Sequence, residues 1–143
     1  MDKQRQNPKP VVTPSRPLIL IVDDDQALRA MIATRLRREG FDTIEAGETA
    51  PALELVRQHR VDLACVDLML PIESGFSLCS ALRRDPKNAE IGIVVVTART
   101  SLEDTTRAME SGADRVVYKP VRMPEFLATV RAVLADRKEG RVP

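Results

Sequence analysis

The stretch LILIVDDDQALR, residues 18–29, joins a run of apolar residues directly to three aspartates. Residues 18–22 contain only leucine, isoleucine and valine, which is typical of a strand buried in a parallel sheet. Asp23, Asp24 and Asp25 follow with no basic residue among them. Carboxylates about 5 Å apart repel by roughly 3 kcal/mol at an effective dielectric constant of about 20. A buried strand that ends in this way therefore needs positive charge nearby.

Four further short runs rich in β-branched residues follow along the chain. With the first, they cover residues 17–22, 42–46, 61–66, 91–96 and 115–118. Segments with the apolar spacing of helices follow each run, and Pro51, Ser101 and Pro124 are typical of helix starts. This alternation predicts an α/β fold in which a doubly wound, parallel five-stranded sheet has (βα)5 order. The run at 42–46 alternates most, which favours an edge position.

Composition narrows the classes of function. Of 143 residues, 43% are hydrophobic, and 22 basic residues nearly balance 21 acidic ones. This balance, with aromatic residues at 3%, argues against a nucleic-acid-binding surface. No apolar run is long enough to cross a membrane and no secretory signal pattern is visible. We expect a cytoplasmic protein in which Cys65 and Cys79 are buried, unpaired thiols.

The expected domain organisation has one folded unit. Residues 1–16 combine prolines with basic residues and predict a disordered tail. Residues 17–138 contain all the predicted strands and helices and form the domain. Residues 139–143 lose the apolar period and predict a C-terminal stub or linker.

Polar residues stand directly after four of the predicted strands: Asp23 and Asp24, Asp67, Thr97, and Lys119. Because the carboxyl ends of parallel strands share one edge of the sheet, we expect these side chains to converge there. Clustered carboxylates favour a hard divalent cation such as Mg²⁺, which would offset their repulsion. Each residue alone has an ordinary structural explanation, such as a helix cap or a solvated lysine. Asp25 is expected outside the cluster, as the cap of the next helix.

In their order and spacing, five segments resemble the receiver domain of response regulators in two-component signalling. They are LILIVDDDQALR, VDLACVDLMLPIESG, IVVVTA, SGAD and YKP. The resemblance covers about residues 17–136 and implies the flavodoxin-like strand order 2-1-3-4-5. It also implies a cis peptide bond between Lys119 and Pro120.

The resemblance implies a role for each residue at the shared edge. Asp67 would be the phospho-acceptor, whose carboxylate attacks a phosphohistidine on a sensor histidine kinase or phosphotransfer protein. Asp23, Asp24 and Asp67, with the backbone carbonyl of Met69, would hold Mg²⁺ or Mn²⁺. The groups that would bind the phosphoryl oxygens are the Thr97 hydroxyl, the Ala98 amide and the Lys119 ammonium.

The resemblance also implies a switch, and here the chain departs from the family. The family usually has Tyr or Phe three residues before the lysine, as the partner of Thr97, and this chain has Val116. Tyr118 lies two residues later on the same face of the predicted strand. It either substitutes for the missing ring or simply packs at the rim, which is the commoner situation.

The resulting hypothesis is a signalling domain that assists only its own phosphorylation and dephosphorylation. The helix that begins near Ser101, the strand 115–118 and the last helix would form the face for dimerisation or partner binding. Charged residues of this stretch are candidates for pairs between subunits: Arg107, Asp114, Arg115, Arg122 and Arg131.

Other classes of function have weaker support in the sequence. A phosphate-independent pseudo-receiver, which would act as a protein-binding module, is the main alternative, because Val116 departs from the usual switch. A phosphatase of the haloacid dehalogenase type would need a second aspartate at the position of Met69. A flavin or dinucleotide binder would need a glycine-rich loop after the first strand.

Overall fold

A parallel sheet forms the centre of this computed structural model, which describes residues 16–139. Its strands lie in the order β2-β1-β3-β4-β5, so the predicted fold class, strand order and edge position of β2 are confirmed. The bounds of the strands are β1 Leu18–Val22, β2 Asp42–Ala46, β3 Leu63–Val66, β4 Gly92–Thr97 and β5 Arg115–Tyr118. Thr97 is the last residue of β4, whereas the sequence placed it just after the strand.

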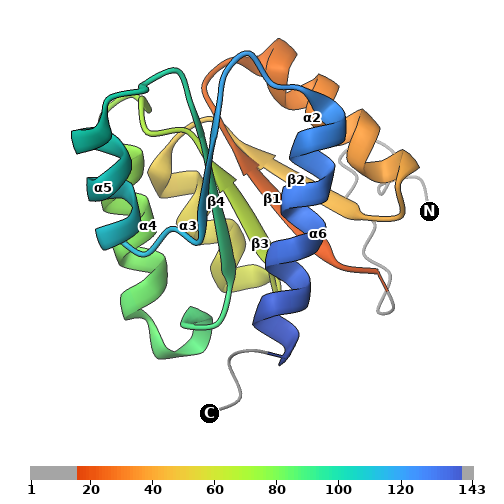
Figure 1. The fold of residues 1–143 in the computed structure, drawn as a ribbon. Helices are drawn as coiled ribbons and strands as arrows, with labels where there is room; N and C mark the ends of the chain where they lie inside the picture. The colour runs from red at the N-terminus through yellow and green to blue at the C-terminus, as the bar shows by residue number, and fades with distance from the viewer. Residues whose placement is uncertain (1–15, 140–143) are drawn as a thin grey trace.

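Helices cover both faces of the sheet (Figure 1). Their bounds are α2 Gln26–Arg38, α3 Thr49–Gln58, α4 Gly75–Arg84, α5 Leu102–Glu110 and α6 Met123–Glu139, with a short 3-10 turn at Pro86–Asn88. Helices α2 and α6 pack on one face, and α3, α4 and α5 pack on the other. Because β1, β3 and β4 are covered on both faces, every residue of these three strands is buried.

Each face of the sheet has its own apolar core. Ile32 and Leu36 of α2 meet Phe126 and Val130 of α6 against one face. On the other face, side chains of α3 and α4 pack against the alternate residues of the same strands, which point to that side of the sheet. Two such layers are what a (βα)5 sequence requires, since each amphipathic helix buries only one stripe.

The two cysteines lie in these cores as unpaired thiols, as the sequence predicted. Burial raises the pKa of both Cys65 and Cys79 to about 12. At neutral pH both are therefore protonated and behave as small apolar side chains.

Side-chain caps fix the starts of three helices at the carboxyl edge of the sheet. Asp25 accepts a hydrogen bond from the Leu28 amide at 3.0 Å, and Ser101 accepts one from the Asp104 amide at 3.0 Å. Ser74 caps α4 through the Ser77 amide at 3.3 Å. The predicted caps at Asp25 and Ser101 are thus confirmed. Caps of this kind satisfy amides of the first turn and set the direction of the loops that precede each helix.

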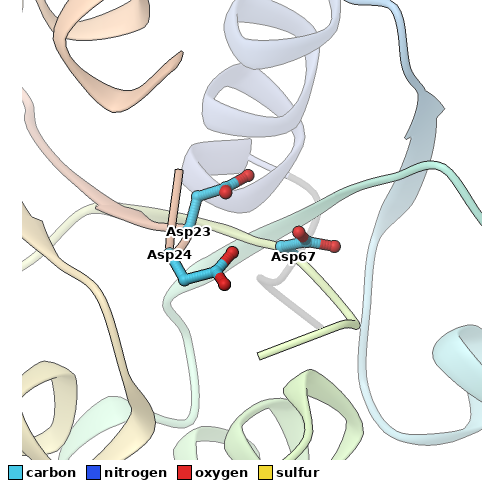
Figure 2. A group of neighbouring side chains, drawn as sticks. All are labelled: Asp23, Asp24 and Asp67. Carbon is cyan, nitrogen blue, oxygen red and sulfur yellow. The ribbon is translucent and has the colours of Figure 1, made fainter. Parts of the chain in front are cut away.

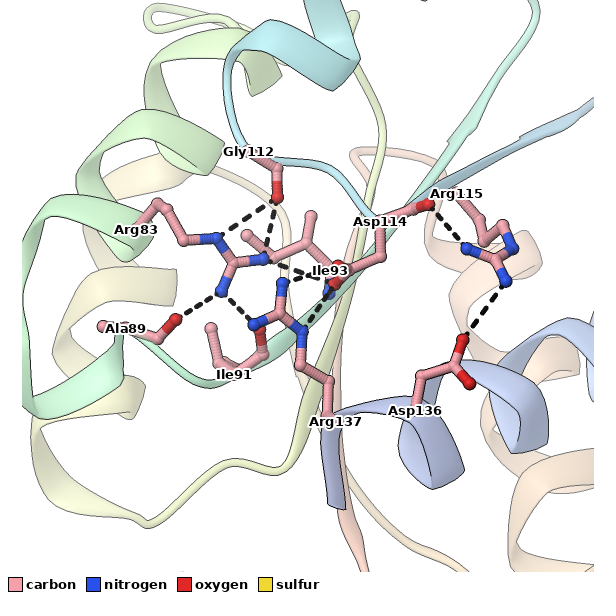
Figure 3. A network of polar contacts seen from close by, with 9 residues as sticks. All are labelled: Arg83, Ala89, Ile91, Ile93, Gly112, Asp114, Arg115, Asp136 and Arg137. Atoms are coloured by element: carbon pink, nitrogen blue, oxygen red, sulfur yellow. Dashed lines mark hydrogen bonds and ion pairs between the residues drawn. The ribbon is translucent and has the colours of Figure 1, made fainter. Parts of the chain in front are cut away.

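A charged network closes the opposite, amino edge of the sheet (Figure 3). The Arg83 guanidinium of α4 donates to the carbonyl oxygens of Ala89, Ile91 and Gly112, each at 2.7 Å. Gly112 has φ +117°, and a Cβ at this position would lie 3.1 Å from the Arg83 Cβ. Glycine therefore meets both a conformational and a steric requirement where the loop approaches Arg83.

Asp114 is the acid at the centre of this network. Its carboxylate pairs with Arg83 at 3.3 Å and with Arg137 of α6 at 2.5 Å. It also accepts a hydrogen bond from the Ile93 amide of β4 at 2.8 Å. The network thus joins α4, β4 and α6, and it holds the last turns of α6 against the body of the domain.

The terminal segments are described only in part. Of the predicted tail, only Arg16 is described, and it donates to the carbonyl oxygens of Arg37 and Phe41. Of the predicted stub, residues 140–143 lie outside the described residues. Between residues 16 and 139, no helix combines the length and apolar character needed to cross a membrane.

The network predicts a large stability effect at Asp114. In Asp114→Ala, two half-buried guanidinium groups lose their carboxylate, so we expect the free energy of unfolding to fall by roughly 2–4 kcal/mol. Urea denaturation measures this loss. Asp136→Ala is the control, because its pair with Arg115 is exposed and should contribute less than about 1 kcal/mol. Equal losses in the two variants would contradict the central role of Asp114.

Candidate functional site

The carboxyl end of β1 places two aspartates at the edge of the sheet. The Asp23 amide donates to the Ala46 carbonyl of β2 at 3.1 Å, so the strand pairing continues one residue beyond β1. The Asp23 side chain is buried and accepts a hydrogen bond from the Asp25 amide at 2.9 Å. Asp24 is exposed and points its carboxylate toward the same space (Figure 2).

Asp67 reaches this space from the neighbouring strand β3. Its amide donates to the Val22 carbonyl at 3.0 Å, which aligns Asp67 beside Asp23. Its buried carboxylate accepts a hydrogen bond from the Met69 amide at 3.1 Å. One carboxylate oxygen from each of Asp23, Asp24 and Asp67 lies within 4.8 Å of the others. Figure 2 shows the three side chains gathered at this edge.

Lys119 supplies the positive charge that this cluster needs. Its ammonium nitrogen lies 2.8 Å from an Asp23 oxygen and 3.0 Å from an Asp67 oxygen. Partial burial by itself would lower the pKa of Lys119. The hydrogen bonds and negative charges of Asp23 and Asp67 outweigh that effect and raise the pKa, so the ammonium form is favoured. The repulsion expected from the sequence is thus offset in part by the chain itself.

The donor set fits a hard divalent cation. Mg²⁺ prefers carboxylate, carbonyl and water oxygens, and two of the three carboxylates are held on rigid strand ends. Lys119 binds from the side of Asp23 and Asp67, whereas Asp24 is free of any ion pair among the contacts described between residues 16 and 139. The cluster thus combines two anchored carboxylates with one that remains open to solvent.

Thr97 lies at the end of β4 and is fully buried. Its hydroxyl accepts a hydrogen bond from the Arg99 amide at 3.1 Å, and its carbonyl accepts one from the Lys119 amide at 2.9 Å. Ala98 follows on an exposed bend. Strand pairing therefore brings Thr97 and Lys119 to the same edge as the aspartates, as predicted.

Comparison with known proteins agrees with this geometry. The family described as the response regulator receiver domain matches residues 19–131. This chain belongs to that family. The receiver is 45% identical over 124 residues to the DNA-binding response regulator MtrA of Mycolicibacterium smegmatis, covering 87% of this chain and 53% of MtrA. It is 39% identical over 127 residues to the transcriptional regulator RpaA of Synechocystis, covering 89% of this chain and 52% of RpaA. The chain thus spans about half the length of the curated relatives it matches.

Solved receiver structures have the same fold. A CheY-like receiver domain protein from Methanospirillum hungatei superimposes with a TM-score of 0.83 at 27% identity, covering 88% of this receiver and 99% of that chain. The BeF3-activated N-terminal receiver domain of RstA from Klebsiella pneumoniae gives a TM-score of 0.75 at 29% identity, covering 82% and 97%.

The loop after Asp67 is tightly built in this receiver. A Cβ on Gly75 would lie 2.1 Å from the Asp67 carbonyl oxygen, so α4 can begin here only with glycine. The intervening turn places Ile72 at φ 68°, and the Glu73 amide donates to the Pro71 carbonyl across it. A β-branched residue in the left-handed region costs on the order of 1–3 kcal/mol. The peptide bond between Lys119 and Pro120 is cis, as the resemblance implied.

Val116 and Tyr118, the two β5 residues expected at the switch, differ in polarity and exposure. Val116 is half-buried and packs against the core on the side of α4 and α5. Tyr118 is 40% exposed, and its hydroxyl lies 2.6 Å from the Thr105 hydroxyl of α5. Tyr118 therefore does more than pack at the rim: it is joined to α5 by a hydrogen bond.

Some contacts of the site have no signal in the sequence. Arg29 of α2 donates to the Asp23 carbonyl at 2.6 Å, and Thr49 donates to the Glu73 carbonyl at 3.2 Å. Thr105 was also absent from the expected site. These residues contact backbone carbonyls or a distant hydroxyl, and such acceptors leave no residue pattern to recognise.

The geometry predicts how the receiver responds to Mg²⁺. In Asp24→Asn, one of three repelling carboxylates becomes neutral, so the unfolding temperature in EDTA should equal or exceed that of the unchanged chain. Addition of Mg²⁺ should raise the unfolding temperature of the unchanged chain more than that of Asp24→Asn. Differential scanning calorimetry measures both values.

Asp25→Asn is the matched control for this experiment. It removes the neighbouring charge but keeps a good helix cap, because Asn caps about as well as Asp. Its response to Mg²⁺ should resemble that of the unchanged chain. Equal Mg²⁺ responses in Asp24→Asn and Asp25→Asn would contradict a metal site at the cluster.

Proposed function

We propose that this receiver accepts a phosphoryl group on Asp67 from the phosphohistidine of a sensor histidine kinase or phosphotransfer protein. The observation that carries this proposal is the placement of the buried Asp67 carboxylate, 3.0 Å from the Lys119 ammonium and within 4.8 Å of Asp23 and Asp24. An aspartate that only ends a strand does not require a nearby ammonium and two further carboxylates. An aspartate that accepts a phosphoryl group requires both.

The proposed transfer needs positioning and neutralisation of charge. A carboxylate oxygen of Asp67 forms a bond to phosphorus as the bond from phosphorus to the partner's imidazole nitrogen breaks. The electron pair of the broken bond stays on that nitrogen, and the product is an acyl phosphate. The Lys119 ammonium, the Thr97 hydroxyl and the Ala98 amide then bind the phosphoryl oxygens. Mg²⁺ held by Asp23, Asp24, Asp67 and the Met69 carbonyl would neutralise charge on the transferring group.

The modification would change the hydrogen bonding of the site. It adds about −1.5 to −2 charges beside Lys119 at neutral pH. Lys119, which is shared between Asp23 and Asp67 before transfer, is then drawn toward the phosphoryl oxygens. The Thr97 hydroxyl accepts from the Arg99 amide in the unmodified chain and would turn to donate to the phosphoryl group. Thr97 is thus the first element of a two-state switch.

The proposed output face consists of α5, β5 and α6, and we propose a second copy of this chain as its partner. Helix α5 buries only Ala108, and it leaves Leu102 80% and Met109 44% exposed. Tyr118 adds a half-exposed ring from β5. Exposed apolar side chains gathered on one helix and the adjoining edge strand are typical of an interaction surface.

The charged candidates for pairs between subunits are largely used within the chain. Asp114 pairs with Arg83 and Arg137, and Arg115 pairs with Asp136. Arg131 pairs with Glu39, and Arg107 lies over the Phe76 ring at 4.0 Å. Apolar contacts of α5 therefore carry more of the proposed interface than these charges do.

The phosphate-independent pseudo-receiver remains the second candidate function. The observation that favours it is Val116, a partly buried aliphatic side chain with no aromatic ring to take part in the usual exchange of contacts. The two candidates differ in one property, which is whether Asp67 becomes covalently modified.

Intact-mass measurement tests the modification. Incubation with phosphoramidate and Mg²⁺ should add the mass of one phosphoryl group to the chain, and Asp67→Asn should show no gain. Asp62→Asn is the control variant, since Asp62 contacts the Leu18 amide away from the acidic cluster. A chain that gains no mass, or an Asp67→Asn variant that gains the same mass, would favour the pseudo-receiver.

Light scattering after gel filtration tests the output face. Beryllium fluoride with Mg²⁺ should convert the unchanged chain from monomer to dimer, and Leu102→Asp should remain monomeric. An added aspartate in the first turn of α5 is compatible with the helix dipole, so folding should be retained. Met31→Asp, at an exposed position of α2, is the control and should dimerise normally. Dimers of Leu102→Asp would place the interface elsewhere.

A further inference from the structure

Tyr118 is the only tyrosine in the chain, and it lies between two residues of the phosphoryl site. In the pairing of β4 with β5, its Cα partner is Thr97. The next residue along the chain is Lys119, whose ammonium contacts Asp23 and Asp67. The Lys119 amide also donates to the Thr97 carbonyl at 2.9 Å. A displacement of the backbone of either Thr97 or Lys119 therefore displaces the backbone of Tyr118.

The other end of Tyr118 reaches a different element. Its hydroxyl lies 2.6 Å from the hydroxyl of Thr105, which is on α5. The start of α5 is held separately, because Ser101 caps it and the Thr105 amide donates to the Ser101 carbonyl at 3.0 Å. Between Thr97 and that cap, residues 98–100 are exposed and lie outside any helix or strand, and the Arg99 side chain donates to Asp104 of α5 at 2.9 Å. The start of α5 is therefore held by its own cap and by Arg99, whereas among these contacts only the hydroxyl pair joins it to the end of β5.

We infer that the hydroxyl pair of Tyr118 and Thr105 stabilises the unmodified conformation, and that the phosphoryl group on Asp67 separates the pair. This inference rests on the proposed function. Turning Thr97 and Lys119 toward Asp67 pulls the end of β5 toward the site, while Thr105 stays with α5. The two hydroxyl oxygens are 2.6 Å apart. A relative shift of about 1 Å would therefore move them beyond hydrogen-bonding distance.

Val116 explains why Tyr118 is the residue of β5 that forms the hydrogen bond to α5 in this chain. Val116 lies on the same face of β5, packs against the apolar core and has no group that can form a hydrogen bond. Tyr118 combines the ring and hydroxyl with a position one residue from Lys119. The pair thereby regulates the same face of α5 and β5 that carries the exposed Leu102 and Met109.

The pair also has a suitable strength for a switch. A single hydrogen bond between partly exposed hydroxyls shifts an equilibrium by roughly two- to tenfold. Such a bias favours the unmodified conformation without preventing the change when new charge arrives at Asp67. Loss of the pair should thus make the active conformation easier to reach, not harder.

Binding of beryllium fluoride in the presence of Mg²⁺ tests this prediction. The concentration at half saturation, followed on backbone amide resonances around Asp67, should fall roughly two- to tenfold in Thr105→Val. Thr106→Val is the matched control: Thr106 is the neighbouring, exposed threonine of α5 and should give the value of the unchanged chain. Tyr118→Phe combined with Thr105→Val should give the same value as Thr105→Val alone, since both substitutions remove one bond.

A second readout reports on the hydroxyl pair itself. Tyrosine labelled with ¹³C at Cζ gives one resonance, because the chain has one tyrosine. Beryllium fluoride should move this resonance in the unchanged chain toward its position in free Thr105→Val, where the bond is absent. The resonance of Thr106→Val should move as in the unchanged chain.

The outcomes separate the inference from the proposed function. If beryllium fluoride does not bind the unchanged chain, the phosphoryl-acceptor function fails and the inference fails with it. If beryllium fluoride binds but the tyrosine resonance does not move, only the inference is overturned. Equal half-saturation values for Thr105→Val and Thr106→Val would also overturn it, because a purely structural contact need not bias the binding.

Discussion

The ammonium group of Lys119 offsets the repulsion among the clustered carboxylates. This allows them to lie close together at the carboxyl edge of the folded sheet. Two buried aspartates on neighbouring strands would otherwise face each other across a few ångströms of low-dielectric space. The lysine comes from a third strand, so the neutralisation exists only once β1, β3 and β5 are in place. Assembly of the sheet and assembly of the acidic site are thus one event. The same ammonium is the group that an incoming phosphoryl oxygen would engage.

The sheet has two edges with different physical character. At the amino edge, Arg83, Asp114 and Arg137 tie helices to strands through a closed set of charged hydrogen bonds. At the carboxyl edge, polar groups point toward open space and share their contacts, as Lys119 does between Asp23 and Asp67. Under the proposed function this division is useful, since one end stays fixed while contacts at the other are exchanged.

The sequence was sufficient for the fold and for most of the site, for a definite reason. Buried parallel strands are apolar throughout, so a polar residue that ends an apolar run indicates the carboxyl end of a strand. Because the strands are parallel, all these polar residues lie at the same edge of the sheet. Asp23, Asp67, Thr97 and Lys119 were found in this way. Arg83 and Arg29 were not, because their acceptors are mainly backbone carbonyls. Thr105 was missed because its partner lies 13 residues away across a loop whose course depends on tertiary packing.

The buried thiols have a practical consequence for experiments on this molecule. Cys65 and Cys79 sit in opposite core layers, and burial raises the pKa of each to about 12. Maleimide and other thiol reagents react with the accessible thiolate, which neither residue offers in the native state. A single cysteine introduced at an exposed position between β4 and α5, such as Thr100, would therefore accept a spin label or fluorophore selectively without removal of the native cysteines.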